Sequence, residues 1–323
     1  MTEIKGRPFD PAQGTTVVEP AGAGKGHWVG ALGVLHDPAT GDTYMFYRSR
    51  RPIGEGRGWK CQVSRSEDGE HFTEAWTCTK EQLDAESIEG GALARGPDGS
   101  YRLYVSYLDN ADRRWKIALI EADSLAEFDP AQRRVVFSGE DADSDGVKDP
   151  HVAVVDGRYY MFLNHAPKWL TAPATDVEEM HGTGNVFATK FGGSGGLATS
   201  EDGVHFVWQG DVIAPGHGWD SLLTRIDTML WQPPLFVVYY SGRGSVEETY
   251  EDRTGVAVSL DLERFHKLSD DAPLLVSPLA TGALRYMDAV VVGDEVFYYY
   301  EYARADGAHE IRMSKTSSAP IVT

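Results

Sequence analysis

The chain has few cysteines and no long hydrophobic run. Its 323 residues include only Cys61 and Cys78, too few for the disulfide framework of a small secreted protein. The two residues flank one predicted hairpin, and we expect a pair of buried thiols. No segment approaches the roughly 18 consecutive apolar residues of a membrane-spanning helix. The N-terminal residues contain no apolar signal-peptide core, so we expect a cytoplasmic protein.

Positive charge is also scarce. The sequence has 30 Lys and Arg against 49 Asp and Glu, which gives a formal net charge of −19. Nucleic acids and anionic membranes are bound by Lys and Arg side chains that neutralise phosphates, so neither is an expected partner. The same balance disfavours a highly anionic substrate unless a local basic pocket overrides it. A small neutral carbohydrate is compatible with this composition.

Helical periodicity does not extend beyond a turn or two, whereas aromatic residues and glycines are plentiful. The 15 Tyr, 12 Phe, 8 Trp and 35 Gly suit many short strands joined by tight turns. Five times, an apolar run turns at Gly, Asp or Pro into an aromatic-rich strand. These predicted hairpins are 31–35 with 44–47, 91–94 with 101–107, 151–155 with 159–163, 228–231 with 235–240, and 289–292 with 296–300.

A phrase of the form Ser-x-Asp-Gly-x-x-Phe follows four of these hairpins. It is clear at 66–72 and 200–206, and weaker at 122–128 and 259–265. Its acids, Asp68 and Asp202, are interpreted as turn-stabilising groups. Self-similarity at intervals of tens of residues is typical of repeat architectures. With four strands in each of five repeats, the pattern predicts an all-β five-bladed β-propeller of four-stranded antiparallel blades.

The predicted propeller is a single domain over residues 1–323. Its blades are expected at about residues 27–80, 88–137, 148–214, 222–276 and 284–323, and residues 15–18 are candidates for the strand that closes the ring. One interval between successive phrases is longer than the others, and its excess lies within Asn164–Gly196. Long irregular loops in compact domains are usually functional or disordered. We expect this one at the mouth of the pocket.

The innermost strand of each blade lines the central channel of a propeller. Aligning the five hairpins gives equivalent positions to Val29, Glu89, Asp149, Arg225 and Tyr286. Two residues further along, on the same strand face, the alignment places His151, Asp227 and Asp288. The residues expected to meet in the central funnel are Glu89, Asp149, Asp227, Asp288, Arg225, Arg285, Tyr286, His27 and Trp28, with Arg48, His151 and His165 as further substrate contacts.

Several carboxylates beside arginines and aromatic rings are what hydrolysis of a glycosidic bond requires. One carboxylic acid protonates the leaving oxygen, and a second carboxylate activates water or attacks the anomeric carbon. A third can keep the acid's pKa high by repulsion between like charges. Arginine and tryptophan would orient the hydroxyls and cover one face of the sugar. The sequence therefore predicts a carbohydrate-processing site.

Two of the hairpin openings resemble those of the five-bladed propeller glycosidases of glycoside hydrolase families 43 and 32. Lys148-Asp149-Pro150-His151-Val152 is similar to their Asp-Pro opening, in which the Asp modulates the acid's pKa or stabilises the transition state. Ile88-Glu89-Gly90-Gly91 is similar to their opening that carries the catalytic acid. The resemblance implies a glycosidase in which Glu89 is the general acid and Asp149 the modulator.

This chain departs from the family pattern in two respects. The first opening, His27-Trp28-Val29-Gly30, has no acid where these families place their base or nucleophile, and the Glu motif precedes the Asp-Pro motif. The base is then expected from Asp227 or Asp288. Each candidate also has a structural interpretation: Asp149 as a partner of Lys148, Glu89 as a surface charge, and Asp227 and Asp288 as salt-bridge partners of Arg225 or Arg285.

Three functions stay open at this point. The first is a glycoside hydrolase that acts on a small neutral glycoside, and the second is a phosphorylase on the same fold, with Arg225, Arg243 and Arg285 near the phosphate. The third is a non-catalytic carbohydrate-binding propeller. A sialidase is disfavoured because those enzymes have six blades.

No His/Cys spacing indicates a zinc site, no cofactor is expected, and no pattern specifies the axial calcium found in some relatives. The acidic run at 247–252 is interpreted as a solvated loop.

Overall fold

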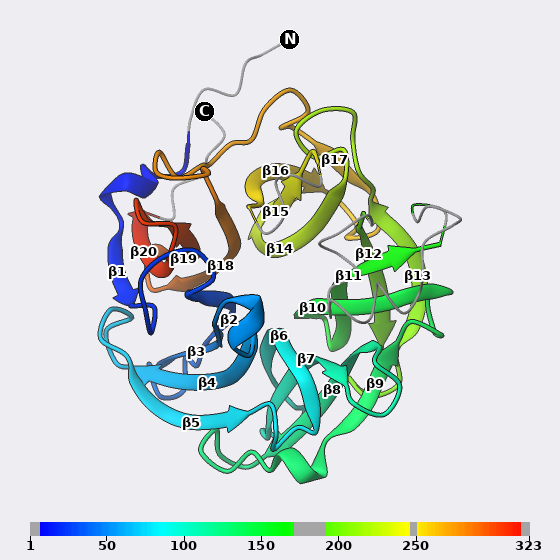
Figure 1. Cartoon of the computed structure of the whole chain (residues 1–323). Coiled ribbons are helices and arrows are strands. Elements are labelled where there is room, and N and C mark those ends of the chain that lie inside the picture. The colour runs from blue at the N-terminus through cyan, green and yellow to red at the C-terminus, as the bar shows by residue number, and fades with distance from the viewer. Residues whose placement is uncertain (1–6, 169, 171–191, 246–250, 318–323) are drawn as a thin grey trace.

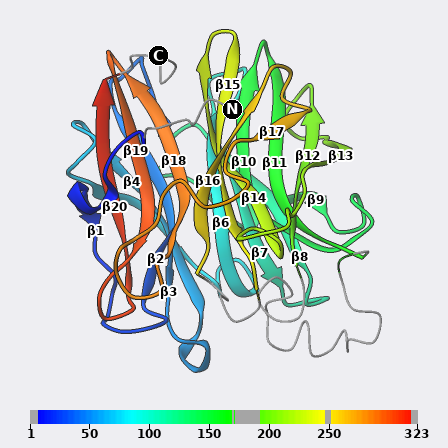
Figure 2. The same ribbon diagram turned by 90° about the horizontal axis from the view of Figure 1, so that it is seen from above.

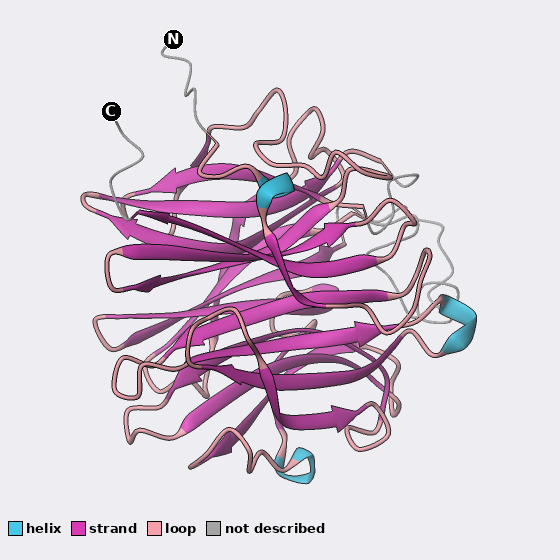
Figure 3. Cartoon of the chain, turned by 90° about the vertical axis from the view of Figure 1, so that its left-hand side faces the viewer, coloured by secondary structure: helices cyan, strands magenta, loops and turns pink. Residues whose placement is uncertain are grey.

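The structure is a computed structural model that describes residues 7–168, 170, 192–245 and 251–317. In this part of the chain nearly all regular structure is strand, and the helices are single 3-10 turns (Figure 3). These turns are η1 (Pro11–Gln13), η2 (Ile53–Glu55) and η3 (Pro130–Gln132). The prediction of an all-β protein is confirmed.

The strands of the described residues form five four-stranded antiparallel units. Unit 1 contains β2 (Trp28–His36), β3 (Thr43–Arg50), β4 (Gly58–Ser66) and β5 (Thr73–Thr79), and unit 2 contains β6 (Ala85–Arg95), β7 (Tyr101–Asp109), β8 (Trp115–Ala122) and β9 (Arg134–Ser138). Unit 3 contains β10 (Ser144–Val155), β11 (Arg158–Pro167), β12 (Ser194–Ser200) and β13 (Val207–Ile213). Unit 4 contains β14 (Leu223–Gln232), β15 (Leu235–Arg243), β16 (Arg253–Ser259) and β17 (Phe265–Lys267). Unit 5 contains β18 (Leu284–Val292), β19 (Glu295–Ala303), β20 (His309–Ser317) and β1 (Thr15–Val18).

Units 5 and 1 are linked where the ring of units meets itself. A single parallel pair, Trp28 with His309, joins them into one eight-stranded sheet, whereas units 2, 3 and 4 are separate sheets. Strand β1 pairs with β20, so the outer strand of unit 5 comes from the other end of the chain. The predicted four-stranded antiparallel sheets are therefore confirmed.

The five units surround a common centre, and β2, β6, β10, β14 and β18 are the strands nearest to it (Figure 1). Seen from above, the strands of all units run roughly alongside one another (Figure 2). Apolar clusters lie between neighbouring units, as where Phe46 and Val63 of unit 1 pack with Leu103 and Val105 of unit 2. A single unit cannot bury its own apolar faces, so each depends on its neighbours.

The repeated Ser-x-Asp-Gly-x-x-Phe phrase forms the turn between the third and fourth strands of its unit. In unit 1, Ser66 Oγ accepts the Gly69 N–H at 2.8 Å, and Asp68 Oδ1 accepts the N–H groups of Glu70 and His71 at 2.8 Å each. The same bonds recur in unit 3 around Ser200 and Asp202. The phrase thus stabilises a turn, as its residue types suggest.

The phenylalanine of each phrase packs edge-on against an aromatic ring of the preceding unit. The four ring pairs are Phe72 with Tyr299, Phe128 with Trp76, Phe206 with Tyr104 and Phe265 with Phe162, with centroids 5.6–6.0 Å apart. Two of the partners, Tyr299 and Tyr104, also donate their hydroxyl hydrogens to the phrase's glycine carbonyl. The phrase therefore joins each unit to its neighbour as well as making a turn.

Each innermost strand carries a β-bulge at an equivalent place. The register shifts lie between Gly30 and Gly33, Ile88 and Gly91, Lys148 and His151, Ile226 and Thr228, and Arg285 and Asp288. Bulges redirect side chains and are common beside active sites. Three bulge residues, Ala31, Asp149 and Tyr286, have left-handed φ values of 53°, 55° and 49°.

The bulges correct part of the alignment predicted from the sequence. Glu89, Asp149 and Tyr286 are the first bulge residues of their strands, as the alignment required. In unit 1, however, the counterpart is Ala31 and not Val29, which pairs regularly with Ser49. In unit 4 it is Asp227 and not Arg225, which pairs with Ser241. A bulge adds a residue to one strand, so a strict period of two misplaces the residues beyond it.

Two further expectations concern local segments. Most of Asn164–Gly196 lies outside the described residues, which include the segment's two ends, in β11 and β12. Cys61 and Cys78 face each other across β4 and β5 as free, buried thiols. In the described part of the chain, no helix has the length and apolarity needed to cross a membrane.

Candidate active site

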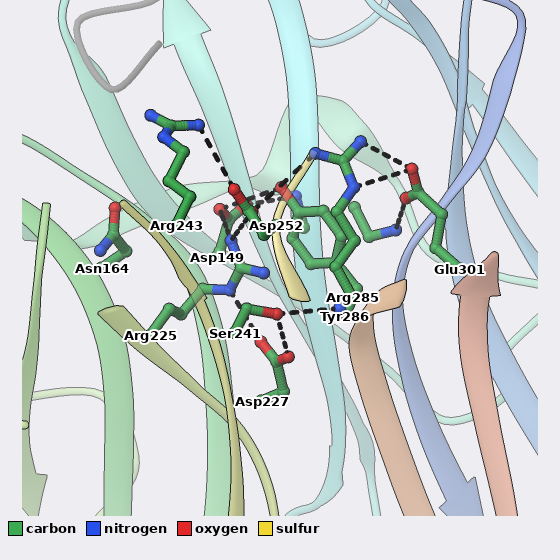
Figure 4. A network of polar contacts seen from close by, with 12 residues as sticks. Asp149, Asn164, Arg225, Asp227, Ser241, Arg243, Asp252, Arg285, Tyr286 and Glu301 are labelled. Atoms are coloured by element: carbon green, nitrogen blue, oxygen red, sulfur yellow. Dashed lines mark hydrogen bonds and ion pairs between the residues drawn. The ribbon is translucent and has the colours of Figure 1, made fainter. Parts of the chain in front are cut away.

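Twelve buried residues form a continuous set of polar contacts at the centre of the molecule, and we call them the axial network. Figure 4 shows the part of it around Arg225 and Arg285. Its members are Arg48, Arg50, Glu89, Lys148, Asp149, Arg225, Asp227, Arg243, Asp252, Arg285, Tyr286 and Glu301. None is more than 8% exposed. They come from the innermost strands, from the ends of the second strands, and from the segment before β16.

Arg225 joins carboxylates of two units. Its Nε donates to Asp227 Oδ1 at 2.8 Å, and its Nη1 lies 3.2 Å from Asp149 Oδ2. The guanidinium also stacks on the Tyr286 ring, 3.8 Å from the centroid. Figure 4 shows Arg225 between the two carboxylates. The structure therefore brings together Asp149, Arg225, Asp227 and Tyr286, as the sequence predicts.

Asp149 is held by donors from four directions. Its Oδ1 accepts the Gly90 N–H at 3.0 Å, while its Oδ2 lies 3.2 Å from Lys148 Nζ and accepts the Tyr286 hydroxyl at 3.3 Å, in addition to the Arg225 contact. Asp tolerates the left-handed backbone conformation found here better than most residues. Asp149 thus pairs with Lys148, which is the structural role considered for it above. It also lines the cavity at the centre of the molecule.

Asp227 lies in a setting that favours its protonated form. Burial raises the pKa of its carboxyl group to about 6, although Arg225 and a hydrogen bond from the Ser241 hydroxyl act in the opposite direction. The negative charge of Asp252 adds to the increase. A carboxyl group with a pKa near neutrality is suited to proton donation in catalysis.

The surroundings of Glu89, in contrast, favour its ionised form. Burial alone would raise its pKa, but the positive charges of Arg48, Lys148 and Arg50 outweigh burial and lower the pKa to about 2. The nearest contacts are Arg48 Nη2 at 3.1 Å and Arg50 Nη1 at 3.8 Å. Glu89 therefore belongs to the axial network and is not a surface charge. Because it is ionised at neutral pH, it has no proton to donate to a leaving group.

Glu301 occupies the place beside unit 1 where no acid is present. Its Oε2 accepts the Ala31 N–H at 3.2 Å, and a Cβ atom on Gly30 would lie only 1.8 Å from that oxygen. Its Oε1 accepts from Arg285 Nη2 at 2.6 Å and lies 2.7 Å from His309 Nδ1. These contacts overcome the effect of burial and hold the pKa of Glu301 well below its usual range.

Trp28, expected beside the funnel, covers the edge of this group. Its ring stacks on His309 with centroids 4.5 Å apart, and its Nε1 donates to the Gly307 carbonyl at 2.9 Å. Arg285 lies over the same ring, 5.2 Å from the centroid. Trp28 is 2% exposed, so it packs against the network from within unit 1.

Asp252 is a network residue that the sequence does not indicate. Its carboxylate lies 3.4 Å from Arg243, 3.8 Å from Arg225 and 3.9 Å from Arg285. The interpretation of residues 247–252 as a solvated run is wrong for Glu251 and Asp252, which are 5% and 2% exposed. An acidic run gives no signal of which members turn inward, because their partners lie on other strands.

Asp288 lies apart from the arginines and connects three units. Its carboxylate accepts the Val34 N–H of unit 1 at 2.6 Å, the Thr228 hydroxyl of unit 4 at 2.7 Å and the Ala289 N–H at 2.8 Å. Burial raises the pKa of Asp288, and the nearby His151 opposes that effect. These contacts favour a structural role for Asp288, but one made by hydrogen bonds and not by the salt bridge to Arg225 or Arg285 that its structural interpretation expected.

We expect Asp288→Ala to lower the free energy of unfolding by about 2–4 kcal/mol, because buried N–H and O–H donors of three units lose their acceptor. Chemical denaturation measures this loss. The variant is expected to keep its turnover at a temperature where it stays folded. Loss of turnover from a folded Asp288→Ala protein would instead favour the catalytic role predicted from the sequence.

The three predicted histidines are placed differently. His151 lines a cavity on the axis, and burial lowers its pKa. His165 is not in the network: its Nε2 lies 2.5 Å from Asp211 on the outer strand of the same unit, and its ring packs against Trp208. His27 contributes its carbonyl oxygen to the His309 N–H at 3.2 Å, and its side chain is partly exposed.

The axial cavity is small. It has a volume of about 20 Å³ and is lined by Asp149, His151, Arg225, Asp227 and Tyr286, with Leu32 and Gly90 among the remaining residues. A cavity of this size holds about one water molecule. Asp149 and Asp227 therefore border the same water-sized space. Within the described residues, no group of three or more His, Cys, Asp and Glu side chains could hold a metal ion.

The chain matches no protein-family model and no curated protein, but it is similar to solved structures over most of its length. A structure described as a glycoside hydrolase has a TM-score of 0.69 at 14% identity, covering 95% of this chain and 91% of that chain. The β-1,2-mannobiose phosphorylase of Listeria innocua, in complex with β-1,2-mannobiose, has a TM-score of 0.61 at 16% identity, with coverages of 99% and 95%.

A third similar structure is described by the statement that the GH130 family of mannoside phosphorylases contains glycoside hydrolases that target β-1,2 mannosidic linkages in Candida mannan. Its TM-score is 0.61 at 17% identity, covering 97% of this chain and 96% of that chain. At such identities, the similarity establishes that this chain shares the fold of these proteins. Function has to be argued from the site.

Proposed function

We propose that the chain is a single-domain, five-bladed β-propeller enzyme that hydrolyses the glycosidic bond of a small glycoside or oligosaccharide. Five four-stranded units around a common centre and the fold shared with glycoside hydrolases support the architecture. The observation that carries the function is the pair of carboxyl groups bridged by Arg225, one of which has a pKa raised to about 6. Pairs of carboxyl groups in unlike environments are typical of glycosidases.

Asp227 is the general acid in this proposal. Its proton passes to the glycosidic oxygen as the bond from that oxygen to the anomeric carbon breaks. Asp149 is the partner carboxylate, which takes a proton from water as the water oxygen attacks the anomeric carbon, or attacks that carbon itself. Both residues line the same water-sized cavity, so the two carboxyl groups border one shared space.

Glu89 and Asp288 receive other roles than those expected from the sequence. With a pKa of about 2, Glu89 fits the ionised partner of Arg48 and Arg50 better than it fits a proton donor. Asp288, whose acceptor sites are filled by groups of three units, fits a structural role better than that of a base. We therefore assign the acid to unit 4 and the partner carboxylate to unit 3.

A panel of aryl glycosides and β-linked disaccharides, assayed with and without inorganic phosphate, tests this function. Wild type is expected to release free sugar from at least one substrate without phosphate, and Asp149→Asn to be slowed about 10²-fold or more. The matched control is Asp220→Asn, a buried acid in the segment before β14, which contacts Lys267 and Tyr240 outside the network. Its turnover should stay within a few-fold of wild type at a temperature where it is folded.

The outcomes separate the remaining functions. Turnover that requires phosphate and yields a sugar phosphate would replace hydrolysis by phosphorolysis. Sugar-dependent thermal stabilisation without cleavage of any substrate would replace catalysis by carbohydrate binding. Equal turnover of Asp149→Asn and wild type would show that the assignment of Asp149 is wrong.

A further inference from the structure

Arg48 is a fully buried cation whose guanidinium group forms no hydrogen bond with the described residues. Its side chain is 0% exposed, and Nε, Nη1 and Nη2 have no hydrogen-bond partner within the described part of the chain. Glu89 and Glu301 lie near Nη2, at 3.1 and 4.0 Å, as ion-pair partners. A guanidinium carries five N–H donors in a rigid fork, and buried donors are usually satisfied. Such a group indicates a missing acceptor.

Arg225 also has a buried N–H donor without a hydrogen-bond partner among the described residues. Its Nε and Nη1 are engaged by Asp227 and Asp149, whereas the buried Nη2 has no hydrogen-bond partner among the described residues. Stacking on Tyr286 and the two carboxylate contacts fix the plane of the guanidinium. Arg225 also lines the axial cavity. An acceptor from a ligand could therefore meet a donor that is already oriented.

The charges of the axial network point to the same kind of ligand. Six of its members are Arg or Lys and five are Asp or Glu. Glu251, a further buried acid, lies at the edge of the network, where it is 3.5 Å from His309 and accepts a hydrogen bond from the Thr281 hydroxyl. Buried charge of one sign is costly unless it is paired. A local excess of positive charge can attract an anion even to a protein of net charge −19.

We propose that the axial network binds an oxyanion at the unpartnered donors of Arg48 and Arg225, and that the substrate is an acidic glycoside whose carboxylate occupies this place. This inference rests on the proposed function, because it names the substrate class of the same site. Guanidinium forks match the geometry of carboxylates and phosphates. Inorganic phosphate offers the same chemistry, so it is tested as a separate ligand. This proposal differs from the neutral substrate expected from the sequence.

The test compares sugar acids with neutral derivatives of the same sugars. Binding of glucuronic and galacturonic acid is measured by isothermal calorimetry against their neutral methyl esters, with inorganic phosphate as a separate ligand. We expect at least one free acid to bind tenfold or more tightly than its ester. Equal binding of acid and ester, or no binding of any sugar acid to the folded protein, would overturn the proposal. Tight binding of phosphate with no binding of the sugar acids would overturn the substrate class.

Lysine variants locate the anion. Arg48→Lys and Arg225→Lys remove the guanidinium fork but keep the positive charge. Because Glu89, Asp149 and Asp227 keep a cation beside them, both variants are expected to fold. We expect each to bind the acid at least tenfold more weakly than wild type. The control is Arg102→Lys, a buried arginine on β7 that contacts Glu121 away from the network. Its affinity should equal that of wild type. Unchanged affinity in both network variants would contradict the proposal.

Binding is measured without turnover, so the two proposals can fail separately. A protein that binds the free acids selectively but cleaves no glycoside of either kind would retain the oxyanion site and lose the enzymatic function. A protein that cleaves neutral glycosides and binds the acids no better than their esters would retain the function and lose the acidic substrate.

Discussion

Asp227→Asn is expected to lower the turnover of the best glycoside substrate by about 10²–10⁴-fold, because the amide has no proton to give to the leaving oxygen. The side chain keeps its size and can still accept from Ser241 and contact Arg225. The steady-state rate of the variant is measured on substrates with good leaving groups and on substrates with poor ones. The loss should be greatest for poor leaving groups, which need protonation most. An equal loss for both kinds would speak against Asp227 as the acid.

The pH profile depends on the same group. Since the pKa of Asp227 is raised to about 6, the proton is present below that pH, and activity should fall about tenfold per unit above it. Glu89, with its pKa of about 2, stays ionised throughout this range. In Asp227→Asn, any residual rate should lose the descending limb near pH 6. A limb that persists in the variant would belong to another residue.

Stability should depend on the same proton. An unperturbed Asp titrates near pH 3.9, so between about pH 4 and 6 the folded state binds more protons at Asp227 than the unfolded state does. The stability contributed by this group is therefore fully present below about pH 4 and is lost as the pH rises through 6. Denaturation of wild type and Asp227→Asn across this window isolates the contribution.

Arg285→Met is expected to produce the largest loss of stability, about 3–5 kcal/mol, because it leaves the buried Glu301 carboxylate without its closest cation. Glu301 is 0% exposed and receives Nε and Nη2 of Arg285 at 3.0 and 2.6 Å. Chemical denaturation provides the measurement. The double variant Arg285→Met/Glu301→Gln removes both charges and should recover much of the loss.

A surface pair serves as the control for this prediction. Lys168 forms an ion pair with Asp143 in which the two side chains are 58% and 88% exposed, so Lys168→Met should cost much less than Arg285→Met. If the double variant were no more stable than Arg285→Met alone, the loss would come from packing of the arginine side chain and not from the unpaired carboxylate.

The sequence predicted the strands of this fold well because their pattern is local. Apolar runs followed by aromatic runs predicted the hairpin at the start of each unit, and the turn chemistry around Asp68 and Asp202 could be inferred from residue type. The packing of Phe72 and Phe206 on neighbouring units could not be inferred. Spacing along the chain contains no information about which ring a side chain meets in the next unit.

The candidate site was predicted mainly where it lies on the innermost strands. Asp149 and Asp227 could be selected from the start of each hairpin, but Asp252 reaches the centre from another segment, and nothing in its neighbours marks it. The charge state of Glu89 depends on Arg48, Arg50 and Lys148. Those residues belong to two other strands, so the low pKa of Glu89 required the three-dimensional structure.

The pairing of β1 with β20 has a consequence for how the protein is made. Thr15 lies opposite Met313, so unit 5 receives its outer strand from residues that are synthesised well before the rest of that unit. Domains of large proteins generally fold during synthesis from the N-terminus onward. Strand β1 is therefore made before its partner and stays without it until β20 has emerged. A chain that stops before β20 leaves β1 unpaired, so unit 5 is complete only when β1 and β20 are both present.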